Sequence, residues 1–280
     1  MEHYIDEEKI TCFEHLLIED EKCAATRDKY VRDVRKLLAY VGESGRITKE
    51  IMIAYKQYLV ERYAVATVNG ILASVNSFLK KMNWYDCVVK SLKVQREAFR
   101  SRNRELTREE YYRLLETARA RGNERIYLVM ETICATGIRV SELPFITAES
   151  LCTGRARVSL KGKTRTVILS QTLCRKLKQY IKERKIQKGS IFVTKNGQPL
   201  DRSNIFREMK SLCEEAGVDR EKVFPHNLRH LFACTYYQKE KDISHLADLL
   251  GHSSVDTTRI YLVKSSEEQE QQMECLGLVI

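Results

Sequence analysis

Proline is scarce in this chain, and this scarcity is the sequence feature that most constrains its fold. The 280 residues include three prolines and twelve glycines. Proline removes a backbone donor and glycine loosens the backbone, so a chain with few of either can form long helices. Apolar residues at helical spacing predict helices over about 8–41, 48–64 and 67–83, the last two behind Thr48 and Thr67 as caps. The first part of the chain therefore predicts a small helical bundle.

A second region predicts helices with one short hairpin. Thr107 and Glu110 have the spacing of a capping box, and a helix over 126–136 should end at Gly137 in a left-handed turn. Strand-like runs at 157–160 and 164–169 flank Lys161-Gly162-Lys163, which predicts a β-hairpin. Further helices are expected at about 171–185, 203–216, 226–239, 242–250 and 254–263. The fold class is thus mainly α with a small β-sheet.

A basic stretch separates the two regions. Residues 93–104 carry five cations and one anion with little periodicity. We place a helical domain at 1–98, a linker at 99–104 and a second domain at 105–280, whose last residues, 263–280, form a tail. The linker cations are expected to lie near phosphate, although a solvated linker without contacts has the same composition. They are Lys93, Arg96, Arg100, Arg102 and Arg104.

Net charge agrees with a polyanionic partner without identifying one. The chain carries a formal charge of +10 and has a sequence pI of about 9.1. Residues 1–21 hold eight acidic side chains, whereas residues 22–100 hold sixteen basic side chains against seven acidic ones. The first domain is therefore basic once its acidic leader is set aside.

Cysteine usage and the amino terminus predict a cytoplasmic protein. The nine cysteines are odd in number and include no C-x-x-C pair, which argues against a zinc ribbon and against a disulfide framework. The first residues are acidic and have no apolar run, and no run in the chain reaches the length of a membrane span. We expect reduced thiols, no export and no membrane partner.

The candidate chemistry lies in four motifs. Thr136–Leu143 contains Arg139, Pro225–His230 contains His226 and Arg229, and two later motifs place His252 before Tyr261. Breaking a phosphodiester requires cations at the non-bridging oxygens, for which the arginine donor fork is suited. A tyrosine nucleophile has a reference pKa of about 10, so it needs cations and a histidine nearby.

Each residue alone has a plainer interpretation. An arginine after a glycine is usually a surface residue, and most tyrosines bury their rings. His226 and His230 stand at i and i+4 and could bind zinc with His252, but Arg229 would place a cation beside them, so we predict no metal site. Order and spacing together favour the catalytic interpretation. A lysine at the hairpin tip, Lys161 or Lys163, would protonate the leaving hydroxyl.

These motifs resemble the tyrosine recombinase (phage integrase) family in its two-domain, Xer-like form, over most of residues 105–262. The resemblance implies that Arg139 and Arg229 clamp the scissile phosphate. His226 would hydrogen-bond this phosphate or handle the proton of the nucleophile, and His252 would contact the phosphate. Lys161 would be the general acid and Tyr261 the nucleophile that forms a 3'-phosphotyrosine. Glu142 would orient Arg139. His230 would pack or position its neighbours.

The resemblance also implies a fold and partners. It implies an N-terminal helical core-binding (SAM-like) domain and a C-terminal α+β catalytic domain. It implies site-specific recombination or integration of double-stranded DNA with inverted half-sites, as in mobile elements, by a dimer per site and a tetramer in synapsis. No cofactor, metal or ATP is implied. A type IB topoisomerase and an inactive DNA-binding regulator are the alternatives.

The tail is a separate hypothesis. Its apolar end contains Leu276, Leu278 and Ile280. These side chains could pack on a neighbouring protomer or fold back onto their own domain.

Overall fold

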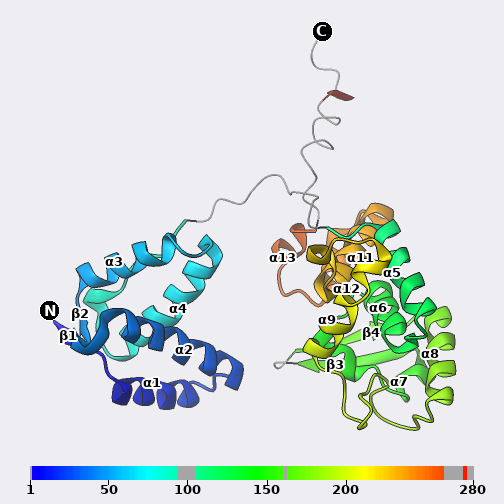
Figure 1. The fold of residues 1–280 in the computed structure, drawn as a ribbon, viewed down its shortest axis with the longest axis horizontal. Helices are drawn as coiled ribbons and strands as arrows, with labels where there is room; N and C mark the ends of the chain where they lie inside the picture. The colour runs from blue at the N-terminus through cyan, green and yellow to red at the C-terminus, as the bar shows by residue number, and fades with distance from the viewer. Residues whose placement is uncertain (1, 94–104, 161–162, 262–273, 276–280) are drawn as a thin grey trace. The chain divides into compact units, whose positions relative to one another are not determined.

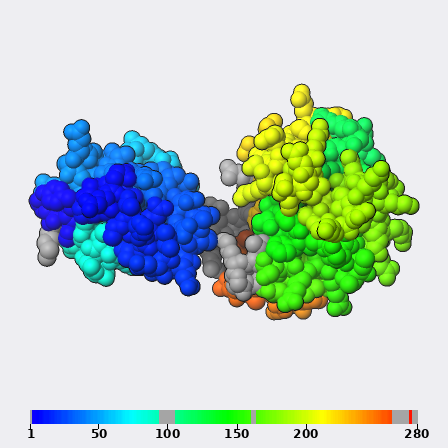
Figure 2. Space-filling model, turned by 90° about the horizontal axis from the view of Figure 1, so that it is seen from below, coloured from blue at the N-terminus to red at the C-terminus, as the bar shows by residue number. Residues whose placement is uncertain are grey.

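Short polar side chains begin most of the helices, because they accept hydrogen bonds from the first free backbone N–H groups. In the computed structural model, Asp6, Thr48, Ser170 and Asp201 each accept such a bond. The structure describes residues 2–93, 105–160, 163–261 and 274–275. The chain divides into two compact units, residues 1–96 and 97–280. Each unit is a closely packed body (Figure 2).

Unit 1 is a helical bundle with a two-stranded sheet at its start (Figure 1). In chain order its elements are β1 (His3–Tyr4), α1 (Glu7–Glu19), α2 (Ala24–Val41), the 3-10 helix η1 (Gly42–Ser44), β2 (Arg46–Ile47), α3 (Lys49–Val60), α4 (Val65–Lys81) and the 3-10 helix η2 (Tyr85–Cys87). Helix α4 is central to the core, and its buried residues include Leu72, Val75 and Phe78. The predicted bundle is confirmed.

Two details of the unit 1 prediction are wrong. The segment 8–41 is two helices, because Glu21 adopts a left-handed backbone (φ 55°) and the Lys22 N–H turns back to the Leu17 carbonyl. Thr67 is not a cap, since α4 starts at Val65, after Ala64. Thr48, by contrast, accepts from the Ile51 N–H as predicted.

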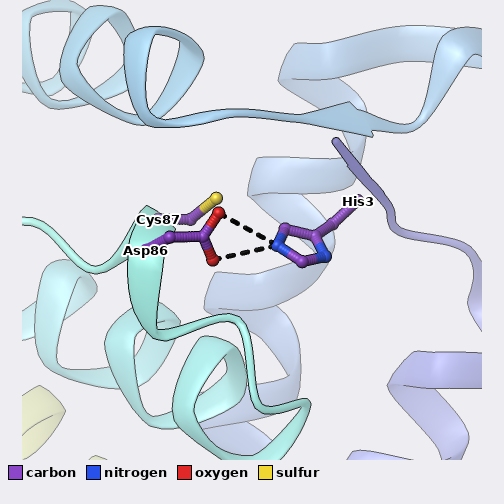
Figure 3. A group of neighbouring side chains, drawn as sticks. All are labelled: His3, Asp86 and Cys87. Carbon is purple, nitrogen blue, oxygen red and sulfur yellow. Dashed lines mark hydrogen bonds and ion pairs between the residues drawn. The ribbon is translucent and has the colours of Figure 1, made fainter. Parts of the chain in front are cut away.

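The N-terminal strand of unit 1 is fastened to its last turn by a histidine. His3 Nε2 lies 2.9 Å from one carboxylate oxygen of Asp86 (Figure 3). The His3 ring also stacks on Trp84. Cys87 is next to this pair and completes a trio of metal-ligand types. Burial raises the pKa of the Cys87 thiol to about 11, which makes it a poor ligand at neutral pH. We interpret the group as a hydrogen-bonded contact between His3 and Asp86 that joins the two ends of the bundle.

The described part of unit 2 contains helices and a two-stranded hairpin (Figure 1). In chain order its elements are α5 (Arg108–Ala120), α6 (Glu124–Thr136), the 3-10 helix η4 (Val140–Phe145), α7 (Ser150–Thr153), β3 (Arg155–Leu160), β4 (Lys163–Ile168), α8 (Gln171–Glu183), α9 (Arg202–Lys210), α10 (Cys213–Ala216), the 3-10 helix η5 (Arg220–Lys222), α11 (Pro225–Glu240), α12 (Ile243–Leu250) and α13 (Val255–Arg259). The strands β3 and β4 are antiparallel, with Val158 opposite Arg165.

Most of the predicted elements of unit 2 are confirmed. Thr107 and Glu110 form the reciprocal capping box, and α6 ends at Gly137 with φ 62°. The helix predicted over 203–216 is wrong as a single element, because it breaks into α9 and α10 at Ser211 and Leu212. Among the helices that the structure describes, none is long and apolar enough to cross a membrane.

The hairpin and the end of α12 meet beside the start of η4. The Arg165 side chain on β4 donates to the Leu249 carbonyl at the end of α12 and to Glu142 in η4. Arg139, directly before η4, and Arg229 on α11 point to the same place, as their contacts below show. Segments far apart in sequence therefore converge on one region of unit 2.

Candidate active site

Arg229 is the most deeply buried charged residue of the site. Pro225 is the first residue of α11, where its fixed φ suits a helix start, and Arg229 follows one turn later. Only 2% of Arg229 is exposed, and its guanidinium donates to the carbonyls of Gly137 at 2.6 Å and Leu250 at 2.8 Å. Burial lowers the pKa of Arg229 to about 10, so it remains a cation at neutral pH. The protein thus holds a fixed charge without a carboxylate partner among these contacts.

Arg139 is placed by the glycine turn that ends α6. A Cβ on Gly137 would lie 2.4 Å from Phe232 Cδ1, so the turn requires glycine both for its backbone and for its packing. The Arg139 side chain is 40% exposed and donates to Glu142 Oε1 at 2.9 Å. It also approaches the Gly251 carbonyl at 3.4 Å. Arg139 is therefore oriented by the protein and still open to a ligand.

Glu142 is a buried carboxylate between two arginines. Its oxygens accept from the Arg139 N–H at 2.9 Å and from Arg165 Nη2 at 2.6 Å, besides the Arg139 side chain. Burial would raise the pKa of Glu142, but these donors outweigh it and hold the pKa below its ordinary value. Glu142 is therefore an anion in direct contact with both the backbone and the side chain of Arg139.

His252 is held neutral between Arg229 and Thr258. Its Nε2 lies 2.9 Å from Arg229 Nη2, and its Nδ1 lies 2.8 Å from Thr258 Oγ1. Because a guanidinium can only donate, Nε2 accepts and the proton is on Nδ1. Burial, together with the neighbouring cations Arg229, Arg139 and Arg165, lowers the pKa of His252 to about 4. The imidazole is thus a neutral hydrogen-bonding group at physiological pH.

Tyr261 lies directly behind this imidazole. Tyr261 is 5% exposed, and its ring stacks on His252, with centroids 5.9 Å apart and planes 13° apart. A hydrogen bond between the Tyr261 side chain and Arg229 acts to raise the arginine pKa. His226 and His230 flank the same ring at centroid distances of 6.3 and 5.2 Å. The phenol is therefore surrounded by three imidazoles and a cation.

His230 and Cys234 support the tyrosine from α11. Cys234 Sγ donates to the Tyr261 carbonyl at 3.2 Å and lies 3.4 Å from His230 Nδ1. His230 is buried, and its Nε2 lies 3.6 Å from Glu105. His230 thus packs against Tyr261 and Cys234, and sequence reasoning had not identified Cys234.

The structure brings most of the predicted site together and leaves part of the prediction outside what it describes. Arg139, Glu142, Arg229, His252 and Tyr261 converge through the contacts above. Lys93 is exposed at the end of the described part of unit 1, and Lys163 is the first residue of β4. The other predicted residues lie outside the described residues: Lys161, Arg96, Arg100, Arg102, Arg104, Leu276, Leu278 and Ile280.

Arg165 and Thr258 are site residues that sequence reasoning missed. Thr258 stands three residues before Tyr261, but nothing in the sequence gave its hydroxyl a partner. Arg165 had a signal, because it falls on the same face of β4 as the buried Val167, where a charge requires a partner. Its partner Glu142 comes 23 residues earlier in the chain.

The arrangement favours an anion over a metal ion. The site holds three arginines and one carboxylate: Arg139 and Arg165 contact Glu142, whereas Arg229 donates to a backbone carbonyl. This composition leaves excess positive charge near the Tyr261 phenol. The lone pair of His252 Nε2 is directed at a guanidinium, so this imidazole is unsuited to ligate a metal ion. A zinc site at His226, His230 and His252, which the sequence does not favour, therefore has no support from the orientation of His252.

Comparison with known proteins identifies the family to which the chain belongs. Residues 104–268, more than half of the chain, match the phage integrase family. Tyrosine recombinase XerA of Pyrococcus furiosus is 27% identical over 277 residues, covering 90% of this chain and 96% of that protein. Tyrosine recombinase XerC of Roseiflexus sp. is 29% identical over 279 residues, covering 88% of this chain and 86% of that protein.

Solved structures share the fold. A crystal structure of XerA recombinase covers 98% of this chain and 99% of its own, at 25% identity and a TM-score of 0.54. A lambda integrase dimer bound to a core site covers 93% of this chain and 77% of its own, at 18% identity and a TM-score of 0.74. The sequence match and the convergence of two arginines, two histidines and a tyrosine show that this chain belongs to the phage integrase family of tyrosine recombinases.

Proposed function

We propose that this chain is a site-specific DNA recombinase that cuts and rejoins strands through a covalent bond to Tyr261. The observation that carries the proposal is the assembly of Arg139, Arg229, His252 and Tyr261 within one unit. Arginine forks bind phosphate oxygens, a neutral imidazole donates or accepts a hydrogen bond, and the phenol supplies a nucleophile. These groups are the ones that a phosphodiester exchange requires.

The proposed reaction conserves the energy of the broken bond. The Tyr261 oxygen attacks the scissile phosphorus and loses its proton, while the bond from phosphorus to the 5' oxygen breaks. The 5' oxygen leaves as a hydroxyl after taking a proton, and the DNA is held as a 3'-phosphotyrosine. A 5' hydroxyl of the partner strand then reverses the step. Neither ATP nor a metal ion enters this scheme.

Each residue has a proposed task in this reaction. Arg139 and Arg229 neutralise the charge that builds on the non-bridging oxygens. His252 contacts the phosphate as a neutral group, and His226, exposed at the start of α11, is placed to handle the phenol proton. The general acid is a hairpin lysine, Lys161 by its match to the family, with Lys163 as the rival.

The proposed partners follow from the number of bonds exchanged. One unit assembles one nucleophile, so exchange between two duplexes requires four copies of the chain. A lambda integrase tetramer bound to a Holliday junction has the same fold, at a TM-score of 0.72 and 18% identity. We therefore propose a dimer on each double-stranded site and a tetramer in synapsis, acting in the cytoplasm where the DNA is. Unit 1 would be the core-binding domain, and residues 93–104 would lie along the phosphates.

Recombination between two copies of the bound site tests this function. Duplexes that the protein binds are first selected from a random pool, and two copies of the recovered site are then placed on one plasmid. We expect deletion or inversion products with the wild type, according to site orientation, and none with Tyr261→Phe. Relaxation without exchange would identify a topoisomerase. Binding without either reaction would identify a regulator.

A further inference from the structure

Arg165 is the charged residue of the site to which the proposed reaction gives no task. It lies on β4 opposite Val158, and its side chain is only 14% exposed. The neighbouring Thr164 and Thr166 are exposed, so Arg165 belongs to the inward face of the strand. A charge on that face is costly unless it is paired, which indicates a specific role.

The Arg165 guanidinium joins two other parts of the site. Its Nη2 donates to Glu142 Oε2 at 2.6 Å, and its Nη1 donates to the Leu249 carbonyl. Glu142 in turn accepts from both the backbone N–H and the guanidinium of Arg139. Arg165 is thus linked through Glu142 to Arg139, which we assign to the phosphate.

The end of α12 is held by three arginines in sequence. Leu249, Leu250 and Gly251 offer consecutive carbonyls, and helix-end carbonyls lack intrahelical partners. Arg165 donates to the first, Arg229 to the second at 2.8 Å, and Arg139 approaches the third at 3.4 Å. His252 follows immediately, so these contacts also fix where its imidazole stands.

The backbone at Gly251 is fitted to the Arg165 side chain. A Cβ at this position would lie 2.4 Å from Arg165 Cδ. The aliphatic part of Arg165 therefore packs directly on the turn that leads from α12 to His252. Arg165 contacts the site through its charge and through its stem.

We propose that Arg165 is a positioning residue for phosphate binding, which acts by holding Glu142 against Arg139. This inference rests on the proposed function. The positive charge of Arg165 also affects His252, because Arg165 is among the cations that lower the pKa of that imidazole. Without Arg165, Glu142 would lose one of its donors, and Arg139 would lose the rigid partner that aims it.

Single-turnover cleavage of the selected duplex tests the proposal. At saturating DNA, Arg165→Gln is expected to cleave about 100-fold more slowly than the wild type, since small misplacements of a catalytic group cost about that much. Binding of the same duplex should change by less than about threefold, which is under 1 kcal/mol. Arg157→Gln is the matched control, because it removes the same charge from an exposed position of the same hairpin. Its cleavage rate should equal that of the wild type.

A double-mutant cycle tests the route through Glu142. If Arg165 acts by holding Glu142, the cleavage rate of Arg165→Gln combined with Glu142→Gln should match that of the slower single variant. Multiplying defects would overturn the inference. Arg165→Lys keeps the charge but lacks the planar fork, so it should remain at least about tenfold slow while melting closer to the wild type. This second variant keeps the test valid if Arg165→Gln does not fold.

A substrate with sulfur at the 5' bridging position separates phosphate binding from proton donation. A thiolate leaves without a general acid, so this substrate restores the cleavage rate of a variant that lacks the hairpin lysine but not that of an Arg139 variant. We expect the cleavage rate of Arg165→Gln to stay low on this substrate, and a fully restored rate would overturn the inference. If the wild type itself cleaves no DNA, the proposed function fails. If Arg165→Gln cleaves as fast as Arg157→Gln, only the role of Arg165 fails.

Discussion

At the scale of single residues, the site depends on an imidazole that does not take up a proton. His252 accepts from Arg229 and donates to Thr258, and it faces three guanidinium groups. A positive charge on the His252 imidazole would repel these arginines. Neutral His252 therefore lets the arginines hold the net positive charge that a phosphate requires.

The protonation of His252 can be followed directly. Its pKa is lowered from 6.5 to about 4 in the folded protein, so between these pH values the unfolded chain binds a proton that the folded chain does not. The stability that His252 contributes is therefore present above pH 6.5 and lost as the pH falls toward 4. We expect the 13Cε1 shift of His252 to stay constant from pH 8 to about 5. An inflection near pH 6.5 would contradict this prediction.

At the scale of elements, the turn after α12 positions the site, because its backbone contacts Arg165, Arg229 and Arg139 and leads into His252. Gly251 and Gly217 both follow a helix with left-handed backbone, at φ 64° and 58°. A Cβ at Gly217 would meet nothing within 4 Å, whereas one at Gly251 would overlap Arg165. The two positions therefore separate backbone strain from displacement of the arginine.

Alanine substitutions at these two glycines give a matched comparison. Gly217→Ala should lower the free energy of unfolding of unit 2 by about 1–2 kcal/mol, the cost of a left-handed non-glycine residue. Gly251→Ala should cost at least about 1 kcal/mol more from overpacking, and it should also slow cleavage by displacing Arg165. Calorimetric unfolding and single-turnover cleavage measure the two effects. Equal stability and cleavage rates for the two variants would refute this account of the turn.

The sequence predicted elements whose ends have local signals. Thr107 with Glu110, Thr48, and Gly137 each determine an end through contacts within a few residues. The breaks at Glu21 and at Ser211 were missed, because neither is marked by the glycine or proline that usually signals the end of a helix. The sheet of β1 and β2 was missed because two-residue strands are too short to show alternation.

The site shows the same division between local and distant information. The pairing of Arg139 with Glu142 spans three residues and follows from the motif. The contacts of Arg165 with Leu249, and of Arg229 with Gly137, span 84 and 92 residues. Such contacts are determined by tertiary packing, so only the structure could show that three arginines meet at the end of α12.

At the scale of the whole molecule, the basic residues at 93–104 are predicted to supply sequence-independent affinity. Each phosphate contact contributes about 0.9 to the slope of log affinity against log salt. Replacing all five cations by Gln should therefore reduce the slope by up to about 4 to 5. Binding measured across KCl concentrations checks this. Replacing the four arginines by Lys keeps the charge and should keep the slope. An unchanged slope in the Gln variant would indicate a solvated linker.

The tail is predicted to serve assembly rather than cleavage. Residues 273–280 include the apolar side chains of Leu276, Leu278 and Ile280. Exposing them to water is unfavourable, so we expect them to pack against a neighbouring protomer. Deleting them should reduce tetramer formation on paired sites, measured by native gel shift, and leave cleavage by a single bound protomer nearly unchanged. Unchanged synapsis would indicate that the tail packs on its own unit.

The most direct measurement of the central claim is covalent trapping. Wild type and Tyr261→Phe are incubated in EDTA with a nicked duplex of the selected site, from which the cut fragment diffuses away. The account predicts an SDS-resistant protein–DNA adduct with the wild type alone, and a modified peptide that contains Tyr261. An adduct with Tyr261→Phe, or no adduct on DNA that the wild type demonstrably binds, would contradict it.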